Sequence, residues 1–360
     1  MIGLTLGRYL SWRFLETILA IFVSISGLSF LIDFIELLRR AGDVPGARAS
    51  FVALMSFLRV PSVSEQILPF AVLFGTMTAF VNLTRKLELV IARAAGVSVW
   101  GFLVPPLLIA SLLGILSVAL YNPLAAEMKQ RADQMEIQLF GRPGTDKDAS
   151  VWLRQRSVDG KATVRADRMT DGGHTLINVV AYLDDSDGRF SERVEAPRAS
   201  LEANAWRLDD ATVVRQGDAA EKVGTYYLAT DLTAEDVLQS AATAESVPFW
   251  NLPAVEDRTE AAGLDATQYR LHYQTLLARP LLLVAMVLVA AAFSLRFVRF
   301  GGIGKMVASG VVAGFVLYVM TKLVANMGGA GLLSAPVAAW APALVGSLLG
   351  ALALLHQEDG

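Results

Sequence analysis

The 360-residue chain contains no cysteine, which excludes disulfide bonds, thiolate catalysis and cysteine-ligated metal sites. Histidine is scarce, and His174, His272 and His356 lie too far apart in the sequence to indicate a metal cluster. Neither sign of charge prevails, since 31 basic and 34 acidic residues give a formal net charge of -3. A nucleic-acid partner requires a basic surface, so we expect no such partner. We also expect no bound cofactor.

Sequence signatures of catalysis are also missing. The segment from Gly301 to Met306 resembles a phosphate-binding loop, but Arg299 stands where the first glycine is required and Met306 where serine or threonine is required. The sequence has no Gly-x-Ser-x-Gly elbow and no His-Glu-x-x-His motif. We therefore predict that the protein is not an enzyme, and that the energy for any work it performs comes from a partner or a gradient.

Ionisable residues are rare in the apolar runs. Glu16, Asp33 and Glu36 lie toward the ends of the first run, and proton relays usually place such groups in the middle of a span. This distribution disfavours a secondary transporter driven by an ion gradient.

Apolar residues are abundant: they make up 54% of the chain, and the mean hydropathy is +0.48. They are concentrated in six runs, at about 17–32, 66–83, 103–121, 280–295, 306–321 and 337–355. About 20 residues cross a bilayer, and the short runs 280–295 and 306–321 can reach that length because their flanking arginines and lysines extend to the headgroups. The first run is too long for a signal peptide and is not followed by a cleavage pattern. The sequence therefore predicts an α-helical membrane protein with six transmembrane helices.

The stretch from about 150 to 233 has a different pattern. Short segments that are rich in β-branched residues, or in which apolar and polar residues alternate, are separated by sequences typical of hairpin turns. Asp171-Gly172-Gly173 and Gln216-Gly217-Asp218 are examples. This spacing predicts an all-β domain inserted between helices 3 and 4, either a compact antiparallel sandwich or a jelly-roll-like fold. The expected organisation is helices 1–3 in residues 1–139, the β domain in 140–264, and helices 4–6 in 265–360.

The basic residues of the short loops predict the orientation. With a cytoplasmic N-terminus, the inner loops carry more lysine and arginine than the outer loops. Both chain termini are then cytoplasmic, and the β domain is periplasmic if the protein lies in a bacterial inner membrane.

A charged interruption at residues 83–97 separates the second and third runs. An apolar face and a glycine stop at Gly96 predict one amphipathic helix there, which we interpret as a coupling helix at about 84–96. The apolar face is formed by Leu83, Leu87, Ile91 and Ala94, and the charged residues Arg85, Lys86 and Glu88 point elsewhere. A solvated connector is the alternative.

The order of three helices, a β domain and three helices resembles the permease family of the lipopolysaccharide-export ABC transporter, over essentially the whole chain. Three segments carry the resemblance: Phe34 to Gly42, Arg85 to Gly96, and Tyr269 to Leu281. The basic pair before Ala41-Gly42 is more similar to the G-type of the two paralogous subunits.

The resemblance implies a half-transporter that works with a paralogous six-helix permease and a cytoplasmic ABC ATPase dimer. It also implies a single-span accessory protein and soluble periplasmic jelly-roll bridge proteins as partners. Glu88 would then dock in a groove of the ATPase, flanked by Arg85, Lys86, Leu87 and Ile91. An ordinary surface carboxylate is the alternative for Glu88.

The resemblance further implies that Arg39 and Arg40, with Glu36 beside them, contact the phosphates of lipopolysaccharide. Interfacial anchoring is the alternative. Asp33 stands where the family often has a further basic residue, and this departure argues against a full phosphate-binding cluster. In the β domain, Ile177 and Val179 are candidates to line an acyl-chain groove, with a plain core role as the alternative.

The expected function is extraction of lipopolysaccharide from the outer leaflet of the inner membrane and its delivery to a periplasmic protein bridge. The alternative is a membrane-anchored periplasmic adaptor or assembly protein, in which the helices serve as an anchor.

Overall fold

A computed structural model describes most of the chain. The described residues are 4–42, 44, 48–140, 151–157, 160–184, 189–215, 217, 219–234, 237, 244–261, 266–296 and 303–358.

Six helices in this part of the chain are long and apolar enough to cross a membrane, as predicted. They are α1 (Leu4–Ala41), α2 (Ala49–Arg85), α4 (Val99–Leu116) with its continuation, α8 (Thr267–Arg296), α9 (Ile303–Gly329) and α10 (Ala335–Glu358). The continuation of α4 is a π-helical turn, η1 (Ser117–Tyr121), followed by α5 (Asn122–Phe140). The helices are longer than the apolar runs because polar turns extend them beyond the hydrocarbon core.

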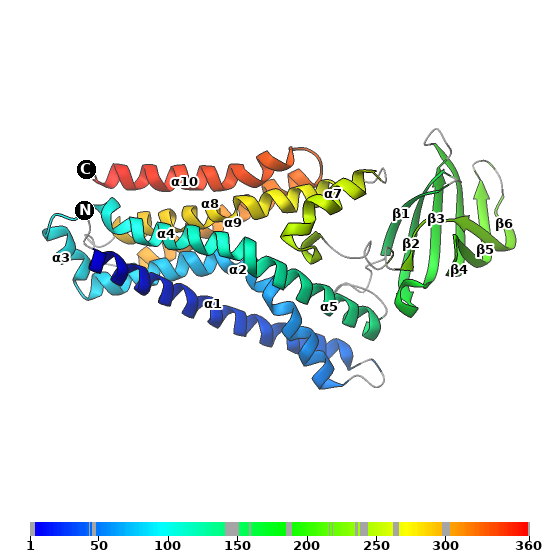
Figure 1. Ribbon diagram of the computed structural model, residues 1–360, viewed down its shortest axis with the longest axis horizontal. Helices are drawn as coiled ribbons and strands as arrows, with labels where there is room; N and C mark the ends of the chain where they lie inside the picture. The colour runs from blue at the N-terminus through cyan, green and yellow to red at the C-terminus, as the bar shows by residue number, and fades with distance from the viewer. Residues whose placement is uncertain are drawn as a thin grey trace.

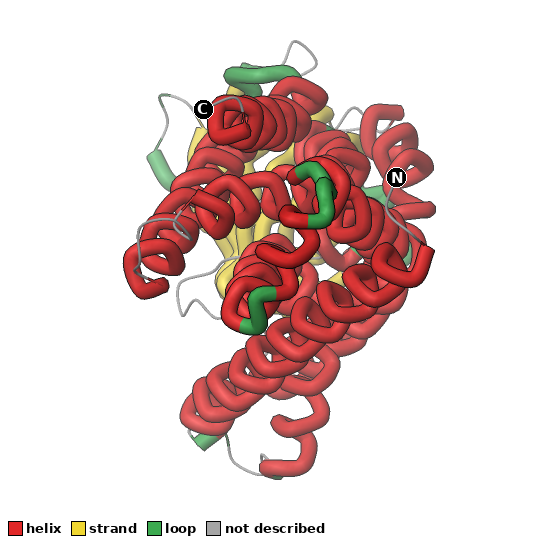
Figure 2. The backbone as a smooth tube through the Cα atoms, turned by 90° about the vertical axis from the view of Figure 1, so that its left-hand side faces the viewer, coloured by secondary structure: helices red, strands yellow, loops and turns green. Residues whose placement is uncertain are grey.

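The helix bundle and the sheet lie at opposite ends of an elongated molecule (Figure 1). The short helix α3 (Glu88–Ala94) and both chain termini are at the end of the bundle that faces away from the sheet. Figure 2 views the molecule from that end, with the helices in front of the strands. If the bundle crosses a membrane, α3 and the sheet are therefore on opposite sides of it.

The predicted all-β domain is present between the third and fourth spans. Its six strands are β1 (Val151–Ser157), β2 (Gly160–Thr170), β3 (Thr175–Asp184), β4 (Phe190–Glu202), β5 (Ala205–Arg215) and β6 (Glu221–Ala229). All neighbours are antiparallel and pair in sequence order, so the described strands form one open sheet with β1 and β6 at its edges.

A side chain joins the two edges of the sheet. The Gln155 amide of β1 donates to the Ala229 carbonyl at the end of β6, at 2.9 Å, and its carbonyl oxygen accepts from the Thr230 hydroxyl, at 2.7 Å. The described backbones of β1 and β6 do not pair with each other.

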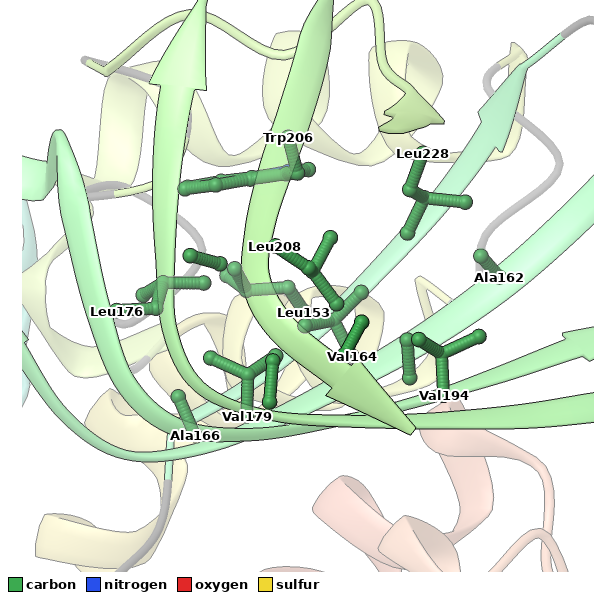
Figure 3. Close-up of a cluster of buried hydrophobic side chains, with 14 of the residues drawn as sticks. Leu153, Ala162, Val164, Ala166, Leu176, Val179, Val194, Trp206, Leu208 and Leu228 are labelled. Atoms are coloured by element: carbon green, nitrogen blue, oxygen red, sulfur yellow. The ribbon is translucent and has the colours of Figure 1, made fainter. Parts of the chain in front are cut away.

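In each of the four central strands, the alternation of buried and exposed side chains shifts by one residue. The four shifts lie side by side in one row across the sheet. In β3 the buried positions pass from Leu176 to Val179, with Asn178 between them at a φ of 51°. In β5 they pass from Leu208 to Ala211, with Asp210 at a φ of 54°. These left-handed residues bend the strands, so the sheet curves around its own apolar core (Figure 3).

The bundle depends on glycines at helix crossings. A Cβ at Gly114 of α4 would lie 2.4 Å from the Pro280 Cα of α8, and one at Gly75 of α2 would lie 2.6 Å from the Ile18 Cα of α1. Hydrophobic burial does not drive helices together in lipid, so close backbone contact of this kind supplies much of the attraction.

Gly114→Ala is expected to force α4 and α8 apart and to destabilise the protein by about 1–3 kcal/mol, because a methyl group has no room there. The matched control is Gly27→Ala in α1, where a Cβ meets nothing within 4 Å. The control is expected to be neutral or slightly stabilising. Thermal unfolding in detergent measures both variants, and equal melting temperatures would contradict the close crossing.

Candidate functional site

The segment predicted as one coupling helix at 84–96 is divided in two. Helix α2 continues to Arg85, the chain turns at Lys86 and Leu87, and α3 begins at Glu88. Leu87 has a left-handed backbone, with a φ of 59°, which no continuous α-helix accommodates. The single helix was therefore a wrong prediction. The glycine stop is confirmed, because the amides of Gly96 and Val97 bond back to the carbonyls of Arg93 and Ala92.

The break also divides the predicted apolar face. Leu83 is buried at the end of α2, whereas Leu87 is 59% exposed and Ile91 66% exposed. Leu89, which the pattern did not single out, is the residue of α3 that is buried among the bundle helices. The apolar residues at 87 and 91 thus point away from the core.

An exposed apolar and basic surface results at this end of the bundle. We call it the α3 surface, and it consists of Arg85, Lys86, Leu87, Val90 and Ile91. Apolar side chains grouped beside exposed charges are typical of a protein interface. The left-handed Leu87 is held in a strained conformation at the same place, as is common at functional sites.

Glu88 lies beside this surface in the first turn of α3. It is half-buried, and its carboxylate accepts a hydrogen bond from the Tyr9 hydroxyl of α1 at 3.0 Å. The structure therefore brings the five residues predicted for coupling, at positions 85–88 and 91, into one small region. It adds Tyr9, which no sequence motif indicated.

The two arginines at the other end of α1 point in different directions. Arg39 is 73% exposed, and its guanidinium donates to both carboxylate oxygens of Glu36, at 3.0 and 2.7 Å. Arg40 is 11% exposed and forms an ion pair at 3.1 Å with Glu136 of α5, whose side chain is 1% exposed. The Arg40 guanidinium also lies 4.5 Å from the centre of the Phe140 ring.

Asp33, the departure noted in the sequence, also has a partner. Its carboxylate lies 3.5 Å from the guanidinium of Arg59 on α2. Asp33 thus faces a cation from the neighbouring helix. Of Arg39 and Arg40, Arg39 is the more exposed.

The two groove candidates in the β domain lie on different faces. Val179 is buried in the concave core together with Leu208 and Trp206 (Figure 3). Ile177 is half-exposed and is not part of that core. The expected alternation is wrong across these two residues because Asn178 changes the phase of the strand. The concave face is strongly apolar and its side chains are packed against one another, which fits the core role for Val179.

Sequence reasoning missed a buried polar cluster inside the bundle. The Glu65 carboxylate of α2 contacts both Asn122 of α5 and Arg279 of α8, and all three residues lie one position outside the predicted spans. One signal was available, because Glu65 directly precedes the second apolar run and lies between two helix-interrupting residues, Pro61 and Pro69. An ionisable residue within a span indicates function by default.

Arg40→Ala is expected to destabilise the protein by about 3–5 kcal/mol, because it leaves Glu136 buried without its partner. Arg39→Ala removes an exposed pair and is expected to change stability by about 0–1 kcal/mol. Thermal unfolding of the two variants in detergent tests this difference. A smaller loss for Arg40→Ala than for Arg39→Ala would contradict the inward position of Arg40.

Comparisons with known proteins agree with this architecture. The family described as "Lipopolysaccharide export system permease LptF/LptG" matches residues 8–356. The LptG protein of Escherichia coli K12 is 25% identical over 331 residues, which cover 88% of this chain and 89% of that protein. The LptG protein of Haemophilus influenzae is 24% identical over 336 residues, covering 89% of each chain. The chain therefore belongs to the LptF/LptG family of lipopolysaccharide export permeases.

Proposed function

We propose that the protein is the G-type permease subunit of an ABC transporter, which extracts lipopolysaccharide from the outer leaflet of the inner membrane. A paralogous six-helix permease forms the other half of the chamber, and a cytoplasmic ATPase dimer supplies the energy. The observation that carries this proposal is the position of the α3 surface and Glu88, at the end of the bundle opposite the sheet.

The α3 surface suits a cytoplasmic motor. Leu87, Val90 and Ile91 are exposed although Leu89 of the same helix is packed into the bundle. A protein that covers these apolar side chains gains binding free energy from burying them. Any displacement of α3 is transmitted through Leu89 to the bundle helices against which it packs. In this arrangement α3 and both termini are cytoplasmic, and residues 140–264 form the periplasmic domain.

The apolar concave face of the sheet suits a domain that receives the acyl chains of the extracted lipid. Removing an acyl chain from hydrocarbon costs about 0.8 kcal/mol for each CH₂ group, so a lipid with several chains requires an apolar acceptor. The core around Val179, Leu208 and Trp206 is apolar, but each of these side chains is at most 2% exposed, so in this proposal an acyl chain enters only when the sheet opens. The open edges β1 and β6 allow a periplasmic jelly-roll bridge protein to join by strand addition. A single-span accessory protein completes the proposed assembly.

Arg39 suits contact with a lipid phosphate. It is exposed at the sheet-side end of α1, and a guanidinium fork matches phosphate oxygens. In this proposal Arg40 does not contact lipid but stabilises the helix bundle through its buried ion pair with Glu136.

Glu88→Ala is expected to lower ATP-dependent release of lipopolysaccharide to a soluble jelly-roll acceptor by about tenfold or more, since it removes a charged contact at a protein interface. The assay uses the complete complex reconstituted in vesicles. The matched control is Tyr9→Phe, which removes the internal hydrogen bond to Glu88 and leaves the carboxylate available. Undiminished release by Glu88→Ala, or an equal loss in Tyr9→Phe, would contradict docking of Glu88 on the ATPase.

Photo-crosslinking separates transport from the adaptor alternative. A photoreactive residue in place of Arg39 is expected to crosslink to lipopolysaccharide, because the side chain is exposed at the proposed lipid entrance. A matched probe at Trp152, an exposed residue of edge strand β1, is expected to crosslink to the bridge protein. Protein crosslinks from Trp152 with no lipid crosslink from position 39 would favour the adaptor.

A further inference from the structure

A buried polar cluster connects three helices at the sheet-side part of the bundle. We call it the polar joint, and it consists of Glu65, Asn122 and Arg279. The Asn122 amide donates to both carboxylate oxygens of Glu65, at 2.9 and 3.2 Å, and the Arg279 guanidinium forms an ion pair with the same carboxylate. The side chains of Glu65 and Arg279 are 9% and 11% exposed. Asn122 is 1% exposed.

The joint also holds the segment that returns from the β domain. The Phe249 backbone amide donates to the Asn122 side-chain oxygen at 2.9 Å. The Trp250 indole donates to the Ala119 carbonyl at 3.2 Å, and Ala119 lies in the π-helical turn directly before Asn122. The short helix η4 (Phe249–Asn251) therefore rests on the joint.

Two further bonds fasten the same returning segment to α2 and α5. The Gln66 amide, next to Glu65 in the chain, donates to the Glu245 carboxylate at 3.2 Å. The Ser246 hydroxyl donates to the Asp133 carboxylate at 2.8 Å. Residues 245–250 are thus anchored at four points on the helices that meet at Glu65.

The helices are locally irregular where the joint forms. Pro61 and Pro69 lie on either side of Glu65, and each removes a backbone hydrogen bond from α2. Figure 1 shows that α2 is bent in its middle. The π-helical turn Ser117–Tyr121 breaks the regular ladder just before Asn122. The backbone hydrogen-bond ladder of two of the three helices is therefore interrupted at the joint, and side-chain bonds hold the helices together there.

Helix α2 connects this joint with the α3 surface. Its last residue, Arg85, belongs to the α3 surface, and Glu65 lies 20 residues earlier, which is roughly 30 Å along the helix. One continuous helical segment therefore has the proposed motor contact at one end and the connection to the β domain at the other.

We propose that Glu65 is a positioning residue that transmits the displacement of α2 to the β domain, through Asn122 and the returning segment at Phe249. The inference rests on the proposed function, since it assigns the route by which the motor reaches the sheet. A buried carboxylate with two partners cannot leave them without exposing an uncompensated charge, so α2, α5 and α8 keep their geometry at this point. Apolar contacts alone would let the helices slide.

The decisive variant replaces the ion pair by apolar residues of similar volume, Glu65→Met with Arg279→Met. Replacing a buried pair in this way is often neutral for stability, whereas removing one partner alone is strongly destabilising. In the reconstituted complex, ATP hydrolysis is expected to stay within about twofold of wild type. The lipopolysaccharide released to the jelly-roll acceptor per ATP hydrolysed is expected to fall by about fivefold or more.

Two companion variants make the test specific. Asn122→Leu keeps the ion pair but removes the hydrogen bonds of Asn122 to Glu65 and to Phe249, and is expected to lower the release per ATP in the same way. Glu260→Gln is the matched control, because Glu260 pairs with Arg270 on α8 at the exposed surface. This control is expected to leave the ratio of release to hydrolysis unchanged.

The outcomes separate this inference from the proposed function. Wild-type complex that shows no ATP-dependent release overturns the proposed function itself. Wild-type release together with an unchanged ratio in the methionine pair overturns the role of Glu65 alone. Loss of complex assembly in both the methionine pair and Asn122→Leu, or a parallel loss of hydrolysis and release, also overturns it, because the residues would then be purely structural.

Discussion

Backbone amides and carbonyls find no water inside a bilayer, and this constraint organises the whole chain. Within the hydrocarbon each peptide group must bond to its own segment, so the apolar runs become helices. The strands, whose edge groups would be unsatisfied in lipid, form a separate domain beyond the end of the bundle. Irregular backbone occurs in the span of α4 at the π-helical turn, where the Trp250 indole bonds to the carbonyl of Ala119.

The same low-dielectric surroundings explain how the protein treats buried charge. Arg40 meets Glu136, and Glu65 meets Arg279, each pair joining helices that are distant in sequence. A buried pair adds little net stability compared with apolar packing, but it strongly opposes any arrangement in which one partner is lost. Such pairs therefore fix how the helices are arranged relative to one another, while the glycines at the crossings of α1, α2, α4 and α8 allow close contact.

Much of the architecture could be predicted because hydropathy and turn residues are local signals. The six spans, the inserted β domain and the stop at Gly96 follow from such signals. The break at Leu87 and the phase change at Asn178 could not be predicted, since both require left-handed backbone at residues other than glycine. Asn178 is held by a cross-strand hydrogen bond from its amide to the Asp167 carboxylate, whereas the Leu87 amide bonds to the nearby Thr84 carbonyl. The separation of Arg39 from Arg40 likewise depends on Glu136, which lies almost a hundred residues later.

The seam between the first and last strands has a mechanical consequence. Because the side chain of Gln155 bridges this gap, widening it breaks hydrogen bonds to Ala229 and Thr230 and leaves the five backbone ladders intact. A net loss of about 0.5–1.5 kcal/mol for each such bond is far smaller than the loss from unzipping a pair of strands. The curved sheet can therefore open between β1 and β6 at low cost, while the pairing of all six strands in sequence order is kept.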